Sequence, residues 1–325
     1  MIMKKLLITI ILLTLCSTHA QTDEKETLEQ LNQKVIISYR KQKFDEALKL
    51  AQQAVDLSIK IYGAEQSETA VAYTSLGVMY QEKRKYKESI ENLQKAVDVY
   101  QKISNSKSED LITAYQILAY SQFLDERKKE SEANYLKAIE ISENKFGKES
   151  KESFTATLNL ANIYARLKEV EKANEFYLKS YALAIKNFGR ESKEMEQVGD
   201  SRSCLVSAQK SDTESAKAFL EARKKMLGET SEQNAGILNG KAKSLPSPTY
   251  PSEARPRRIS GTVSVRVKID EQGNVIEARA VCGPPVLGNA AEYAARGAKF
   301  APTIKDGMLI KTSGIIIYNF VATPF

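Results

Sequence analysis

Several positions of this 325-residue chain carry the same kind of side chain every 42 residues, with no insertion to break the spacing. Leucine recurs in this way at Leu76, Leu118 and Leu160, and each leucine is followed by a small residue. Small residues also recur at Ala47, Ser89, Ser131 and Ala173. Several ladders that share one period indicate stacked copies of one helical unit rather than a single globular core.

Each copy is predicted to be a pair of antiparallel helices. An apolar helical face ends at the charged run Lys83-Arg84-Lys85, and a second apolar face follows from Tyr86 to Tyr100. Copies end with an aromatic residue followed by glycine, and this pair predicts a left-handed glycine cap at the end of the second helix. These pairs are Tyr62-Gly63, Phe146-Gly147 and Phe188-Gly189, with Ser104-Asn105 in the same place in another copy. Because one helix pair cannot cover its own apolar face, the copies are expected to stack into a solenoid.

The repeats resemble the tetratricopeptide repeat in its 42-residue form, as in kinesin light chains. The resemblance is carried by the run from Leu158 to Tyr164, followed by Lys172-Ala173 and Phe176-Tyr177. It covers residues 25–230, and the period weakens beyond Ser192, where an imperfect last helix pair is expected. The resemblance implies a peptide-binding concave face, with five positions facing it: Gln81, Gln116, Tyr120, Asn162 and Arg166. The alternative is that these five residues are ordinary solvent-facing residues of a packed spacer.

A different pattern begins after the repeats. Residues 231–246 contain glycine and proline without helical periodicity and are predicted to be a linker, with an entry strand as the alternative. Apolar residues then alternate with polar ones from Thr262 to Ile269, which predicts a half-buried strand that turns at 270–274 and returns to Cys282. An alanine-rich helix over 287–298 and a last strand over 310–321 complete a small α+β domain at 247–325.

This C-terminal segment resembles the C-terminal domain of TonB, a periplasmic protein that engages outer-membrane transporters. The residues that carry the resemblance are Tyr250-Pro251, the run from Gly261 to Ile269, Gly273-Asn274-Val275, and Lys299-Phe300-Ala301-Pro302. One departure is Ala298, which stands where the family commonly has tryptophan. The expected fold of the whole chain is therefore an α-helical repeat solenoid followed by a small α+β TonB-like domain.

The resemblance implies that an extended partner segment adds to the edge of the last strand. Main-chain hydrogen bonds supply affinity in this mode of binding, and the alternation of side chains supplies register. The residues expected to bind the partner are Tyr250, Pro251, Ile315, Ile317 and Asn319. An exposed edge of this kind also permits a homodimer. The alternative is that 315–320 is a central, buried strand.

The N-terminus reads as an export signal. Lys4-Lys5 precede ten apolar residues from Leu6 to Leu15, and Thr18-His19-Ala20 is a cleavage pattern, so residues 1–20 are predicted to be removed. The expected location is the periplasm, with membrane association only peripheral or through partners. An uncleaved anchor or a lipidated Cys16 is the alternative.

Composition argues against familiar catalysis. The only histidine is His19, so the mature chain would lack the imidazole that triads and many zinc sites need. The net charge of +7 forms no basic stripe, so nucleic acid is not an expected partner. Cys204 and Cys282 are far apart, which favours two buried apolar residues; an export compartment would permit a disulfide, and the sequence leaves their pairing open. No metal site, cofactor or catalytic residue is predicted, and no enzyme activity.

The function expected from these features is protein–protein interaction in the periplasm. The TonB-like domain would engage a TonB-dependent outer-membrane transporter by strand addition, while the repeats bind or position a second partner. The alternative is a structural or assembly scaffold of the cell envelope with no part in transport.

Overall fold

The computed structural model describes residues 23–103, 108–207, 214–227 and 233–322, and the predicted export signal lies outside them. The chain divides into two compact units, Met1–Ala156 and Thr157–Phe325, which we call unit 1 and unit 2. This division falls inside the repeats and not at residue 230, because the last repeat helices pack with the C-terminal domain. Each unit is described by itself.

The repeats are helix pairs, as the 42-residue period predicts. The first helix of each pair is residues 23–40, α3 (Ser67–Glu82), α5 (Ser108–Leu124), α7 (Lys151–Arg166) and α9 (Lys193–Ser207). The second helix of each pair is α2 (Phe44–Tyr62), α4 (Tyr86–Lys102), α6 (Lys128–Phe146), α8 (Val170–Phe188) and α10 (Glu214–Leu227).

The turn inside each helix pair repeats the same backbone conformation. A non-glycine residue with positive φ stands between the two helices at Gln42 (57°), Arg84 (57°), Glu126 (62°) and Lys168 (63°). The glycines after the second helices also have positive φ, of 94° at Gly63, 99° at Gly147 and 90° at Gly189. Their ψ values of 153–166° are extended, so the predicted left-handed cap is corrected to a conformation that is open almost only to glycine.

The ladder positions form the cores of the helix pairs. Leu76, Leu118 and Leu160 are at most 2% exposed. The small residues permit close approach: a Cβ added at Gly77 would lie 2.6 Å from Leu93 Cγ on the partner helix α4. The 42-residue spacing therefore marks the contacts between helices.

The C-terminal domain in unit 2 is a four-stranded sheet with strand order β1-β8-β3-β4. Its strands are β1 (Gln233–Ile237), β3 (Gly261–Ile269), β4 (Val275–Cys282) and β8 (Thr312–Phe320). β3 is antiparallel to β4 and β8, whereas β1 runs parallel to β8. Two small sheets pair β2 (Ala242–Ser244) with β5 (Lys299–Phe300) and β6 (Thr303–Lys305) with β7 (Met308–Ile310).

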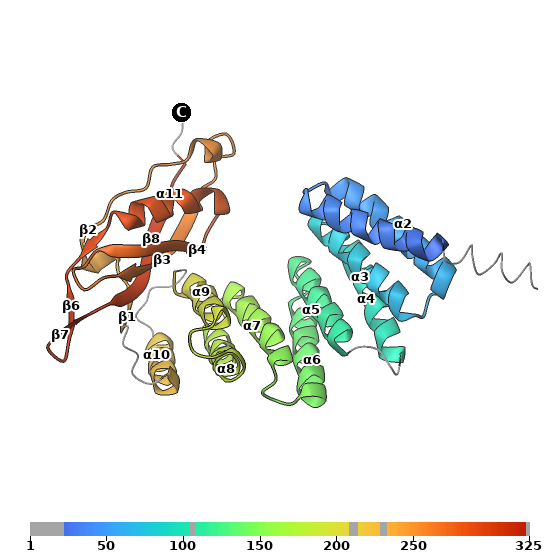
Figure 1. Ribbon diagram of the computed structural model, residues 1–325, viewed down its shortest axis with the longest axis horizontal. Helices are drawn as coiled ribbons and strands as arrows, with labels where there is room; N and C mark the ends of the chain where they lie inside the picture. Colours follow the sequence, from blue (N-terminus) through green and yellow to red (C-terminus); the bar gives the residue numbers. More distant parts are fainter. Residues whose placement is uncertain (1–22, 104–107, 208–213, 228–232, 323–325) are drawn as a thin grey trace, which may run out of the picture. The chain divides into compact units, whose positions relative to one another are not determined.

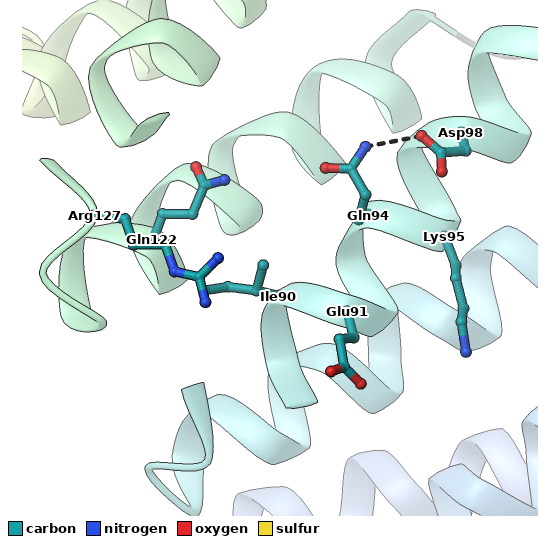
Figure 2. Close-up of a pocket in the computed structure, with 7 residues that line it drawn as sticks. All are labelled: Ile90, Glu91, Gln94, Lys95, Asp98, Gln122 and Arg127. Atoms are coloured by element: carbon teal, nitrogen blue, oxygen red, sulfur yellow. Dashed lines mark hydrogen bonds between the residues drawn. The ribbon is translucent and has the colours of Figure 1, made fainter. Parts of the chain in front are cut away.

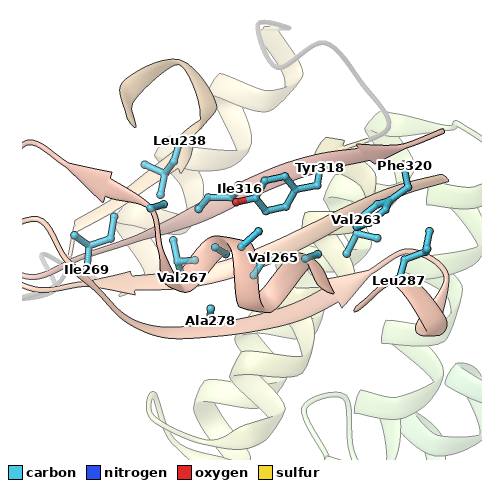
Figure 3. Packing of buried hydrophobic residues seen from close by; sticks show 14 of the residues in the cluster. Leu238, Val263, Val265, Val267, Ile269, Ala278, Leu287, Ile316, Tyr318 and Phe320 are labelled. Atoms are coloured by element: carbon cyan, nitrogen blue, oxygen red, sulfur yellow. The ribbon is translucent and has the colours of Figure 1, made fainter. Parts of the chain in front are cut away.

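Helix α11 (Pro285–Arg296) covers one face of this sheet, and α9 lies against the other (Figure 1). The predicted alternation holds, because Val263, Val265, Val267 and Ile269 are all at most 3% exposed. They pack with Leu287 of α11, Ile316, Tyr318 and Phe320 of β8, and with Leu238 (Figure 3). Ala298 is fully buried in the same cluster.

Two expectations need correction. The segment predicted as a linker contains β1, a short 3₁₀ helix (Asn239–Lys241) and β2, so residues 233–244 belong to the C-terminal domain. The last strand, β8, lies between β3 and β1 and is not an open edge. The sequence hides this arrangement because β1 pairs through its main chain and needs no alternation of apolar side chains.

Among the described residues, no helix is both long enough and apolar enough to cross a membrane. Over the same residues, no group of three or more His, Cys, Asp or Glu side chains is arranged to hold a metal ion.

Candidate interaction site

Three of the residues predicted for the concave face lie on first helices of unit 1. Gln81 is on α3, and Gln116 and Tyr120 are on α5. All three are partly buried, and the Tyr120 ring stacks on Phe123 with centroids 6.4 Å apart. The hydroxyl of Ser121 on α5 donates to Gln81 Oε1 at 2.8 Å. The Gln81 carbonyl oxygen is thus engaged by the neighbouring repeat.

The other two predicted residues, Asn162 and Arg166, are on α7 in unit 2. The hydroxyl of Tyr177 on α8 donates to Asn162 Oδ1 at 2.9 Å and also lies 3.2 Å from the carbonyl oxygen of Ser201. Burial raises the pKa of the Tyr177 hydroxyl, which keeps it protonated and able to donate. Asn162 is therefore oriented from inside the repeats, whereas the Arg166 side chain is exposed.

A buried arginine, which no sequence pattern marks, lies in the last repeats. Arg202 on α9 is 9% exposed, and its guanidinium lies 3.5 Å from the ring centroid of Phe219 on α10. Its Nε donates to Asn174 Oδ1 on α8 at 3.2 Å. Burial lowers the pKa of Arg202 to about 10, so the group remains a cation at neutral pH. Arg202 joins the last three helices of the array.

Unit 1 also carries an open pocket of about 490 Å³ (Figure 2). It is lined by Ile90, Glu91, Gln94, Lys95, Asp98, Gln122 and Arg127. Figure 2 shows Gln94 and Asp98 joined on α4, at a distance of 2.8 Å between Nε2 and Oδ1. None of the five predicted concave-face residues lines this pocket. Its lining carries charges of both signs, from Glu91 and Asp98 and from Lys95 and Arg127.

The side of β8 that faces away from β3 is covered by β1 and the residues that follow it. β1 pairs with β8 in register Gln233 with Thr312 and Ile237 with Ile315. The Leu238 backbone N–H then donates to the Ile315 carbonyl at 2.8 Å.

The side chain of Asn239 continues this pairing. Its Nδ2 donates to the Ile317 carbonyl at 2.7 Å, and its Oδ1 accepts from the Ile317 N–H at 2.9 Å. The side-chain amide thus makes the two hydrogen bonds to Ile317 that the main chain of a longer parallel strand would make.

The other edge of the sheet, β4, is closed by side chains of α11. The Ala280 N–H donates to Glu292 Oε1 at 2.7 Å, and Arg296 Nη2 donates to the Ala278 carbonyl at 3.2 Å. Polar groups that an edge strand would present to another chain are therefore satisfied within the domain. Strand addition is thereby disfavoured at β4.

The predicted binding residues occupy different environments around β8. The Tyr250 hydroxyl donates to the Ile259 carbonyl at 2.7 Å, and its ring lies 6.3 Å from that of Phe320. Tyr250 and the adjacent Pro251 are partly buried. Asn319 is exposed and accepts a hydrogen bond from the Thr262 hydroxyl at 2.8 Å. Tyr250 thus holds the segment that precedes β3 against β8. Asn319 lies on β8 beyond Ile317, the residue that Asn239 contacts.

The polar face of the sheet is fastened to α9. Cys204 on α9 and Cys282 on β4 form a disulfide, with Cα atoms 5.4 Å apart. The expectation of two unpaired cysteines is therefore wrong. No spacing pattern in the sequence predicts the pairing, because only packing of α9 on the sheet brings together residues 78 positions apart.

Ion pairs reinforce this junction. Arg279 Nη2 donates to Asp200 Oδ2 at 2.6 Å, and Arg266 Nη2 lies 3.0 Å from Asp200 Oδ1. Burial raises the pKa of Asp200, and the two arginines oppose that rise. Glycine at 199 makes room for Arg266, since an added Cβ would lie 2.7 Å from its Nη2.

Comparisons with known families agree with this architecture. Residues 246–321 match the family described as Gram-negative bacterial TonB protein C-terminal. Residues 27–102 and 68–144 match the tetratricopeptide repeat. The comparison with curated proteins found no match.

Solved structures are similar to the repeats. The TPR-like repeats of a kinesin light chain from Podosopora anserina share 18% identity, at a TM-score of 0.50, over 62% of this chain and 98% of that one. A variant of the same repeats shares 17% identity at the same TM-score, over 62% of this chain and 97% of that one. A Rap protein complexed with a competence and sporulation factor shares 15% identity at a TM-score of 0.48, over 62% of this chain and 54% of that one. At these identities, the first two show that the helical part has the TPR fold.

Proposed function

Because this chain carries tetratricopeptide repeats followed by a TonB C-terminal domain, we propose that it is a non-enzymatic interaction protein of the Gram-negative cell envelope. Its C-terminal sheet binds an extended segment of a partner protein along β8, and its repeats bind or position a second partner. The partner at β8 is a periplasmic segment of a TonB-dependent outer-membrane transporter.

The observation that carries this proposal is the contrast between the outer edge of β4 and the side of β8 that faces away from β3. Side chains from α11 close the edge of β4, whereas β8 is paired with a short parallel segment through its main chain. β8 therefore accepts an extended peptide in the manner of strand addition. Ile315, Ile317 and Asn319 supply the main-chain contacts, and Tyr250 and Pro251 support the strand from behind.

The repeats supply the second interaction. We assign this role to the residues predicted for the concave face, Gln81, Gln116 and Tyr120 in unit 1 and Asn162 and Arg166 in unit 2, each set within its own unit. The disulfide and the Asp200 ion pairs favour a fixed orientation of the repeat helix α9 on the sheet. A partner held near the end of the array is then presented at a set angle to whatever binds β8.

The export pattern at residues 1–20 and the disulfide both favour the periplasm, where disulfides persist. Cleavage after Ala20 would remove the apolar segment. The protein would then act as an adaptor and not as a membrane-anchored energy transducer.

Photo-crosslinking in intact cells tests the proposal. A benzophenone amino acid at position 319 is expected to capture the periplasmic segment of a transporter. The matched control places it at Tyr293, which is 83% exposed on α11 and lies off the proposed edge. Equal capture from both positions, or capture from 319 of envelope assembly factors alone, would contradict strand addition to a transporter. The latter result would instead favour the scaffold function.

A further inference from the structure

The partner site proposed on β8 already holds a strand from the same chain. β1, Leu238 and Asn239 together occupy the side of β8 that strand addition requires. We call residues 233–239 the internal strand. A partner cannot pair with Ile315 and Ile317 while these backbone groups are bonded to the internal strand.

The internal strand is held weakly at its start and strongly at its end. Its first five residues are Gln-Asn-Ala-Gly-Ile, and Asn, Ala and Gly are poor strand formers. Its pairing with β8 is irregular between Asn234 and Ile237. In contrast, Leu238 is 2% exposed within the domain core, and Asn239 makes both of its side-chain bonds to the main chain of one residue of β8, Ile317.

The chain after the internal strand is anchored independently. Ala242 and Ser244 of β2 pair with Phe300 and Lys299 of β5. Detachment can therefore begin at residue 233 and stop at β2, without unfolding the sheet formed by β8, β3 and β4.

We propose that the internal strand is an exchangeable occupant that a partner segment displaces from β8. This inference rests on the function proposed above, and it specifies the partner's chemistry. The partner runs parallel to β8, as β1 does. It places an apolar side chain where Leu238 enters the core, and a peptide group or an Asn or Gln amide opposite Ile317. A segment without the apolar residue fails to compensate for the loss of Leu238 and leaves the internal strand in place.

The test uses the purified full chain and a fluorescent peptide with the sequence of residues 233–239. In the wild type the tethered copy outcompetes the peptide, since a short tether gives it a high effective concentration. Asn239→Ala removes two hydrogen bonds from the tethered copy only, so the peptide is expected to bind about tenfold more tightly. Leu238→Ala is the second variant, and it acts on the apolar contact. Asn92→Ala is the matched control, because its side chain bonds within α4 to the Glu88 carbonyl.

Tighter binding of the peptide to both variants, but not to the control, would support exchange. A peptide that carries the L238D change should bind neither the wild type nor any of the variants. Equal binding to wild type and variants, or no binding to variants that circular dichroism shows to be folded, would overturn the inference. Such a failure rules out pairing of a partner with Ile315 and Ile317, but it leaves open whether the protein binds a transporter, which the crosslinking at position 319 tests separately. Failure of the crosslinking at position 319 refutes the proposed function but leaves exchange untouched.

Discussion

Loss of the Cys204–Cys282 disulfide should loosen the repeat helix α9 from the sheet. The perturbation is the double replacement of Cys204→Ser and Cys282→Ser, which keeps side-chain size and polarity close to those of reduced cysteine. The bond closes a loop of 78 residues in sequence. The loop-entropy relation for a loop of this length gives a stabilisation of about 4.5 kcal/mol.

Hydrogen exchange measured by mass spectrometry reads this change locally. Peptides from α9 and β4 should exchange faster in the double variant by up to roughly a thousandfold, because each 1.4 kcal/mol is a factor of ten in the opening equilibrium. Peptides from α4 in unit 1 serve as the internal control and should not change. Adding a reductant to the wild type should reproduce the effect of the variant.

One result would refute the reasoning. If α9 and β4 exchange within about threefold of the oxidised wild type, the bond does not restrain this junction and the loop-entropy estimate does not apply. The mass of the intact chain checks the premise, because the oxidised protein is lighter than the reduced one by two hydrogen atoms. If the bond does not restrain the junction, the ion pairs alone hold α9 to the sheet.

Three further changes test other parts of the structure. Gly273→Ala should destabilise the C-terminal domain by about 1–3 kcal/mol in urea denaturation, because a Cβ there would lie 2.1 Å from the Phe300 carbonyl oxygen at a φ of 89°; an unchanged midpoint would contradict this. Asp200 should titrate above 3.8 by NMR, since burial raises its pKa. Because the folded state then binds the proton more tightly, protonated Asp200 stabilises the fold below about pH 3.8, and this contribution is lost as the pH rises through the folded-state pKa. Asp200→Asn should remove this dependence of stability on pH. Replacing both Glu292 and Arg296 by alanine should uncover the β4 edge and promote self-association in sedimentation velocity, whereas a monomeric variant would show that these side chains do not protect it.

The repeats could be predicted from sequence because their information is periodic. Every copy has to bury the same helix contacts, so Leu76, Leu118 and Leu160 appear at one spacing, and the structure buries all three. The same holds for the C-terminal strand at 261–269, whose alternation corresponds to one buried and one polar face.

The remaining features depend on main-chain contacts or on tertiary packing. The internal strand at 233–239 binds β8 mostly through backbone groups, and a peptide bond looks the same for every residue. The disulfide depends on α9 lying against β4, which no local pattern encodes. The one sequence signal was chemical: two cysteines remain in a chain with an export signal, and pairing is what an oxidising compartment would allow.

Candidate site residues were the least accessible to sequence. Side chains that look available in a helical register can be used internally, as Gln81 is by Ser121 and Asn162 is by Tyr177. The pocket beside α4 combines two helices and a turn, so no single repeat motif marks it.

Amide hydrogen exchange of the purified chain, free and bound to the segment captured at position 319, tests the central claim most directly. In the complex, Ile315 and Ile317 should stay protected, because the partner replaces their hydrogen bonds, while residues 233–239 should lose protection. If residues 233–239 remain as protected as in the free chain, the partner does not replace the internal strand. If no amide on β8 or β1 changes, the sheet is not the binding site.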